Sequence, residues 1–132
     1  MANAVKVAVR VRPFNDRERK LNLDKLCVAM NGAKTTISSG AQDSKNFTFD
    51  HSFWSHDAFR AGADGIARPD PPTSNYATQE LVYRAVGAPL LEKSLQGYNC
   101  SVFACKSPTT TPTITTILTD YSTEYHSHPS QK

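Results

Sequence analysis

One segment, Thr78 to Gln96, constrains the fold more than any other part of this chain. Its apolar residues recur at helical spacing and form one broad face: Leu81, Val82, Ala85, Val86, Leu90, Leu91 and Leu95. Thr78 is a suitable N-cap, and Gly97 suits the position just after a helix end. Pro89 lies inside the segment, two residues after Gly87. We therefore expect a helix that bends or breaks near Pro89.

Short segments around this helix predict β-strands, the first and the fourth by alternation of their residues and the last, which is apolar, as a buried strand. They lie at Val5 to Val11, Leu26 to Met30, Lys34 to Ser38, Phe47 to Phe53 and Ser101 to Ala104. Pro13 ends the first strand because proline cannot donate to a ladder. Asn31-Gly32 supplies the positive φ angles of a tight turn. The stretch from Ala58 to Asn75 is rich in glycine and proline, which predicts a loop.

The composition changes abruptly after Ala104. The stretch from Ser107 to Lys132 is dominated by threonine, serine, proline and histidine, and no glycine follows Gly97. Its few large aliphatic residues are Ile114, Ile117 and Leu118, which are too few to bury a face. Because such a segment cannot offset the entropy of ordering it, we predict a disordered tail over residues 105–132.

The overall composition limits the size and the location of the protein. A chain of 132 residues suits one domain at most. The net charge of +3 favours approach to an acidic partner without identifying it. No apolar run approaches the roughly 20 residues of a membrane span. Three cysteines, an odd and sparse set, favour reduced thiols in the cytosol.

No catalytic or metal site is predicted from the residues alone. The charged run that contains Asp16, Glu18 and Asp24 is interpreted as solvated surface, as are His51 and His56. Structural zinc sites prefer cysteines two to four residues apart, and the spacings of the cysteines and histidines near the C-terminus miss this pattern. No pattern in the chain indicates a nucleophile with its base.

The order of several short motifs resembles the first part of a kinesin motor domain. The motifs are Val7 to Asn15 with its Arg-x-Arg-Pro end, Phe47 to Asp50, Phe53-Trp54-Ser55, Tyr76 to Gln79, Val82-Tyr83, Pro89 to Glu92, Gly97 to Asn99 and Ser101 to Ala104. The Trp54-Ser55 pair is most similar to transport kinesins that carry a forkhead-associated domain. The resemblance covers residues 5–104, with an atypical loop at 58–68.

The resemblance implies an α/β fold, in which one long helix packs on part of the mixed central sheet of a P-loop motor. It places the strands Val5 to Val11 and Ser101 to Ala104 inside that sheet. The intact family uses ATP and magnesium, binds microtubules, and works in the cytoplasm on the cytoskeleton. Nucleic acid is not an expected partner.

The resemblance also implies an adenine pocket built from Arg10, Arg12, Pro13 and Tyr83. A planar guanidinium group, a proline ring and a phenol ring can each stack on a base. Simple helix packing explains Tyr83 equally well, and for the two arginines a solvated strand end is the alternative.

The sequence departs from the family after Ala104. Kinesins continue with a loop of the form Gly-x-x-x-x-Gly-Lys-Ser/Thr, whose amides and lysine hold the phosphates. Here Cys105-Lys106-Ser107-Pro108 follows instead. We therefore expect residues 1–104 to be a truncated motor segment without ATPase activity, marginally stable because its sheet edges are unpaired. The alternatives are a short, non-catalytic, partner-binding isoform and a weak adenine-binding module.

Overall fold

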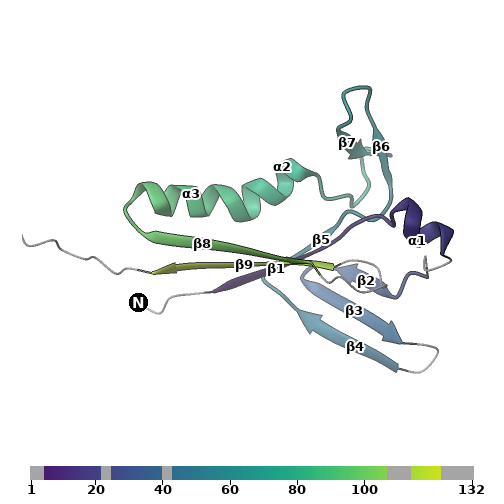
Figure 1. Cartoon of the computed structure of the whole chain (residues 1–132), viewed down its shortest axis with the longest axis horizontal. Helices are drawn as coiled ribbons and strands as arrows, with labels where there is room; N and C mark the ends of the chain where they lie inside the picture. Colours follow the sequence, from purple (N-terminus) through teal and green to yellow (C-terminus); the bar gives the residue numbers. More distant parts are fainter. Residues whose placement is uncertain (1–4, 22–24, 40–42, 107–113, 123–132) are drawn as a thin grey trace, which may run out of the picture.

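The computed structural model describes residues 5–21, 25–39, 43–106 and 114–122. Over these residues the chain forms a four-stranded sheet, a three-stranded sheet and a two-stranded hairpin. One long helical run, α2–η1–α3, lies along one face of the four-stranded sheet (Figure 1). The predicted α/β architecture, with one long helix on a mixed sheet, is confirmed.

The four-stranded sheet has the order β5-β1-β9-β8. Strand β1 (Lys6–Val11) is interior, pairing in parallel with β5 (His51–Trp54) and antiparallel with β9 (Ile114–Ser122). Strand β8 (Asn99–Lys106) pairs only with β9 and forms the edge. The prediction of an interior strand is therefore confirmed for β1 and wrong for β8. Strand β8 has no neighbour beyond it in the described sheet, and its Val102 and Phe103 are each 57% exposed.

The prediction of a disordered tail is wrong for β9. This strand lies between β1 and β8, with Thr116 opposite both Val9 and Cys105. Its many threonines and isoleucines are β-branched and favour strands. An interior strand also forms backbone hydrogen bonds with a neighbouring strand on each side. The prediction from composition considered only the burial of side chains. Residues 107–113 and 123–132 lie outside the described residues, and the domain boundary after residue 104 stays a prediction.

The helical run joins α2 (Gln79–Val82), the π-helical turn η1 (Tyr83–Gly87) and α3 (Ala88–Leu95). Thr78 is the N-cap, as predicted: its Oγ1 accepts a hydrogen bond from the Leu81 amide at 3.1 Å. Of the bend or break expected near Pro89, the break is absent, because the helical run continues through this residue. A wide turn lies just before it, in which the Ala88 amide donates to the Tyr83 carbonyl. A π turn accommodates the missing amide hydrogen of Pro89 without ending the helix.

The Thr78 cap gives a first test of the helix start. We expect Thr78→Ala to lower the free energy of unfolding by about 1 kcal/mol, because the Leu81 amide loses its acceptor. Urea unfolding followed by circular dichroism measures this. Thr73→Ala is the matched control, since Thr73 is exposed and outside any helix. Equal effects of the two changes would show that the cap contributes nothing specific.

The second sheet consists of β2 (Val28–Asn31), β3 (Lys34–Ser39) and β4 (Asp43–Thr48), all antiparallel. Its first turn has Gly32 at φ +58°, as predicted from Asn31-Gly32. The single strand predicted at Phe47 to Phe53 is wrong, because β4 ends before β5 begins and the two belong to different sheets. At the break, Asp50 Oδ2 accepts a hydrogen bond from the Val7 amide at 2.8 Å.

The stretch predicted as a loop between Ala58 and Asn75 contains a small hairpin. Strands β6 (Phe59–Ala61) and β7 (Ala67–Pro69) pair there around Gly65, which has φ +75°. The hairpin projects away from the central sheet (Figure 1). An ion pair between Arg68 and Asp64, at 2.7 Å, closes its tip.

The core lies between the helical run and the central sheet. Ala8, Phe53, Ala77 and Val82 form it, with Ala85 and Val86 packed against it. None of the helices in the described ranges has the length and hydropathy of a membrane span. Cys27, Cys100 and Cys105 are free thiols.

Candidate functional site

The C-terminal half of β1 presents Arg10 toward the helical run. Its guanidinium donates from Nε to Ser55 Oγ at 2.9 Å and from Nη1 to Gln79 Oε1 at 2.6 Å. A longer bond, 3.4 Å, reaches the Ala77 carbonyl, which also accepts from Ser55 Oγ at 2.6 Å. Arg10 therefore ties β1 and the end of β5 to the start of α2, and these contacts fix the plane of its guanidinium.

Arg12 makes a two-pronged ion pair with Glu18. Its Nη1 and Nη2 donate to the two carboxylate oxygens at 2.9 and 2.7 Å, and Nη1 also donates to the Pro13 carbonyl at 2.6 Å. The hydrogen bonds to Glu18 raise the pKa of Arg12 above its ordinary value; burial opposes this, and attraction to the Glu18 charge adds to it. Both terminal nitrogens of the Arg12 guanidinium, Nη1 and Nη2, therefore donate hydrogen bonds within the protein.

Glu18 was expected in solvent, and this prediction is wrong: the residue is buried, with 9% exposed. It belongs to the short helix α1 (Asp16–Lys20) and completes a capping box with Asn15. The Glu18 carboxylate accepts from the Asn15 amide at 2.7 Å, while the Glu18 amide donates to Asn15 Oδ1 at 2.8 Å. The Asn-x-x-Glu spacing could have indicated this role from the sequence.

An aromatic cluster includes Phe14, the residue that follows Pro13. The ring of His56 meets Phe14 edge-on at 4.8 Å between centroids and Trp54 at 5.6 Å. His56 Nδ1 lies 3.0 Å from the Arg12 carbonyl, which can only accept, so Nδ1 carries the hydrogen in this bond. The prediction of a surface histidine is wrong for His56, which is half-buried in this cluster.

Tyr83 lies apart from this network. It occupies η1, one turn after Gln79, and is 51% exposed. Its ring lies beside Gly87, where an added Cβ would come within 2.7 Å of Tyr83 Cδ2. Its side chain forms no hydrogen bond or ring contact with the described residues. The structure thus connects Arg10, through Gln79, to the helix that carries Tyr83, while base binding by Arg10, Arg12, Pro13 and Tyr83 stays a prediction.

Comparison with known proteins decides the family. The sequence profile described as the kinesin motor domain matches residues 10–110, most of the chain. This chain belongs to the kinesin motor domain family. The chain is 40% identical over 105 residues to the kinesin-like protein KIF28 of Rattus norvegicus, and 43% identical over 109 residues to KIF1A of the same species. The alignments cover 77% and 79% of this chain, but only 10% and 6% of those relatives.

Solved kinesin structures share the fold. A KIF14 dimer in the two-heads-bound state, with AMP-PNP and in complex with a microtubule, matches with a TM-score of 0.55 and 34% identity. A KIF14 segment with ADP, also in complex with a microtubule, matches with a TM-score of 0.52 and 34% identity. These alignments cover 74% and 70% of this chain, and 24% and 22% of the KIF14 chains.

Cys105 and Lys106 do not form a phosphate-binding loop in the described structure. A phosphate loop would have to begin after Ala104, where Cys105 and Lys106 instead continue β8 and pair with Thr116 and Thr115. Their backbone groups therefore belong to a strand and do not form a cradle of amides. Within the described ranges, no group of three histidine, cysteine or acidic side chains could hold a metal ion.

Proposed function

We propose that this kinesin-like chain keeps the scaffold of the adenine side of a motor's nucleotide site and does not turn over ATP. One observation carries the proposal. The family match runs through residue 110, yet Cys105 and Lys106 lie in a β-ladder where the family places its phosphate loop. Without amides and a lysine on the phosphates, the charge-assisted hydrogen bonds that dominate nucleotide affinity are missing.

The residues of the adenine side support only weak binding of a base. Arg10 and Arg12 are immobilised by Gln79, Ser55 and Glu18, so their guanidinium planes are preorganised. Stacking on such planes is worth about 1–2 kcal/mol, far less than a useful nucleotide affinity requires. In this proposal Arg10, Arg12, Pro13 and Tyr83 are base contacts of the family site, and ATP with magnesium is the cofactor of the intact motor.

The partner of the whole protein is proposed from its relatives. The two KIF14 structures are complexes with microtubules, which supports tubulin as the proposed partner and the cytoplasmic cytoskeleton as the proposed place of action. The likeness to KIF1A, together with the Trp54-Ser55 pair, favours a transport kinesin of the type with a forkhead-associated domain.

An ATPase assay tests the proposal directly. The purified chain is measured with Mg·ATP, with and without polymerised microtubules, beside a complete kinesin motor domain as the positive control. We expect phosphate release at the background rate in both conditions and no thermal stabilisation by millimolar Mg·ATP. Phosphate release that rises when microtubules are added would contradict the proposal.

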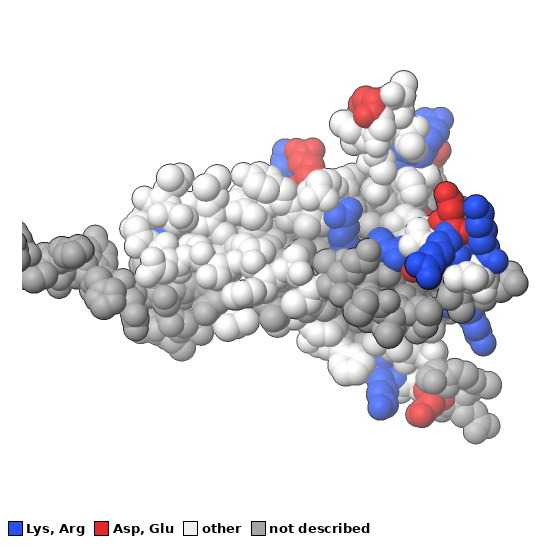
Figure 2. All heavy atoms as spheres, viewed as in Figure 1, with Lys and Arg blue, Asp and Glu red and all other residues white. Residues whose placement is uncertain are grey.

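A non-catalytic partner-binding role is the second candidate, and one surface favours it. Over α3 and β8 the face in Figure 2 shows almost no charged side chain, whereas charges gather around α1. Leu95 of α3 is 81% exposed, and β8 is the edge of the described sheet. Co-purification of an intact chain with a defined partner would support this role. Proteolysis of residues 5–104 as fast as of the C-terminal residues would argue against it.

A further inference from the structure

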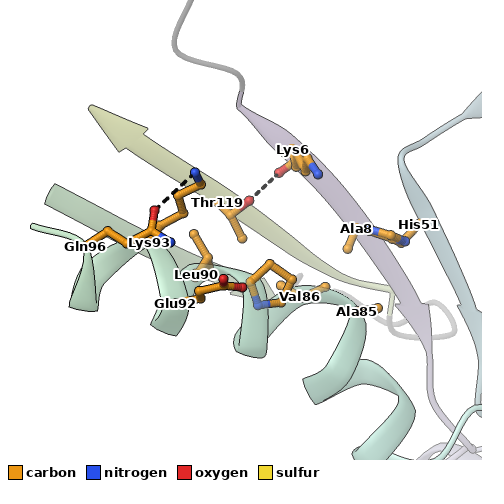
Figure 3. Close-up of a pocket in the computed structure, with 11 residues that line it drawn as sticks. Lys6, Ala8, His51, Ala85, Val86, Leu90, Glu92, Lys93, Gln96 and Thr119 are labelled. Carbon is orange, nitrogen blue, oxygen red and sulfur yellow. Dashed lines mark hydrogen bonds between the residues drawn. The ribbon is translucent and has the colours of Figure 1, made fainter. Parts of the chain in front are cut away.

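A cavity of about 230 Å³ lies between the helical run and the central sheet, and none of the candidate nucleobase residues lines it. Its sheet wall carries Lys6, Ala8, His51 and Thr119, which share one face of the sheet (Figure 3). Ala85, Val86 and Leu90 of the helix face them. Two of the lining side chains, Ala8 on β1 and Ala85 on η1, are small and so leave room between the layers.

The lining of this cavity is mixed: an apolar part is formed by Ala8, Ala85, Val86, Pro89 and Leu90, and polar side chains of Lys6, His51, Glu92, Lys93, Gln96 and Thr119 complete it. Thr119 is 4% exposed and uses its hydroxyl in a long bond, 3.5 Å, to the Lys6 carbonyl. Two cations line the cavity from opposite layers, Lys6 from β1 and Lys93 from α3. Small-ligand sites combine apolar surface with polar groups that orient the ligand, and this lining offers both.

The charges of the lining select the ligand. Lys6 takes part in no ion pair with the residues that the structure describes. Lys93 has only neutral partners there, Gln96 Oε1 at 3.5 Å and the Tyr98 ring at 5.1 Å. Glu92 is the one acidic group of the lining, and His51 is the remaining titratable side chain. Two lysines against one glutamate leave an excess of one positive charge, which matches a single negative charge on a ligand.

We propose that this cavity binds a medium-chain aliphatic monocarboxylate, with its head between Lys6 and Lys93 and its tail against Ala8, Val86 and Leu90. The volume lies below the roughly 300 Å³ at which drug-sized sites begin, so the tail is short. A dianion such as a phosphate monoester is disfavoured, because Glu92 repels its second charge. The site is separate from the nucleotide site and does not depend on the proposed function.

Titration of the full chain with octanoate, 1-octanol and octylammonium tests the site by calorimetry and amide NMR. We expect octanoate to bind with a dissociation constant of about 1 mM or below, and at least about tenfold more tightly than octanol. Shifted amides should cluster at Lys6, Ala8 and residues 85–93. Octylammonium should bind weakest of the three.

Two variants and one control make the test specific. The double change Lys6→Gln with Lys93→Gln should remove the preference for octanoate over octanol, and Ala85→Leu should fill the cavity and abolish binding of both. The pair Lys20→Gln and Lys25→Gln removes two exposed lysines outside the cavity and should change nothing. No octanoate binding, equal binding of octanoate and octanol, or shifts confined to another surface would each overturn the proposal.

Discussion

Thr116→Pro should unfold the central sheet, with a loss of at least about 3 kcal/mol in the free energy of unfolding. Thr116 lies in β9 between Val9 of β1 and Cys105 of β8, so proline there removes a ladder donor from an interior strand. Small domains have only about 5–15 kcal/mol of stability, and this chain has an open edge as well. We expect lost cooperativity in thermal unfolding.

Thr116→Val is the matched control for this prediction. It keeps the backbone donor and the β-branched shape, so its effect should stay within about 1 kcal/mol. The comparison also decides between the disordered tail predicted from composition and the strand observed. If Thr116→Pro unfolds at the same urea concentration as the unchanged chain, β9 does not hold the sheet together.

Glu18→Ala should lower the free energy of unfolding by about 2–4 kcal/mol. The change leaves the half-buried guanidinium of Arg12 without its carboxylate partner and removes one half of the Asn15 capping box. Breaking an ion pair by removing one partner costs more than the pair contributes, because the remaining charge stays desolvated. We take the lower part of the range for this pair, since the Arg12 side chain is 26% exposed.

Urea unfolding followed by the fluorescence of Trp54 measures this loss, and Arg19→Ala serves as the control. Arg19 lies in the same short helix, but it is exposed and is not part of the ion pair with Arg12. Its replacement should change stability by less than about 0.5 kcal/mol. A double change of Arg12 and Glu18 to apolar residues should cost less than Glu18→Ala alone; an equal or larger cost would show that the ion pair is not the source of the effect.

Local patterns in the sequence were sufficient for the elements whose signals are local. The valine alternation predicted β1, Asn31-Gly32 predicted the turn at Gly32, and Thr78 predicted the start of the helix. These features depend on side-chain alternation, positive φ angles and a cap hydrogen bond within a few residues. The order of the short motifs across the chain was also sufficient for the kinesin family, which the family profile confirms.

The predictions that failed depended on contacts between distant residues. The segment from Phe47 to Phe53 reads as one alternating strand, but pairing with different neighbours divides it between two sheets. Glu18 is a different case: its partners Asn15 and Arg12 are only three and six residues away, and the Asn-x-x-Glu spacing is a local signal that the interpretation as solvated surface left out. Burial of a charge depends on the partner that arrives, and composition does not specify that partner.

The sequence by itself determined the family, the helix with its cap, and the residues that stand where a phosphate loop would begin. The tertiary structure decided that Ile114–Ser122 is an interior strand, that β8 is an edge, and that Arg10 is fixed by Gln79. The physical reason is the range of the interactions. Alternation and caps act within one turn or one strand, whereas a β-ladder gains its hydrogen bonds only when segments a hundred residues apart meet.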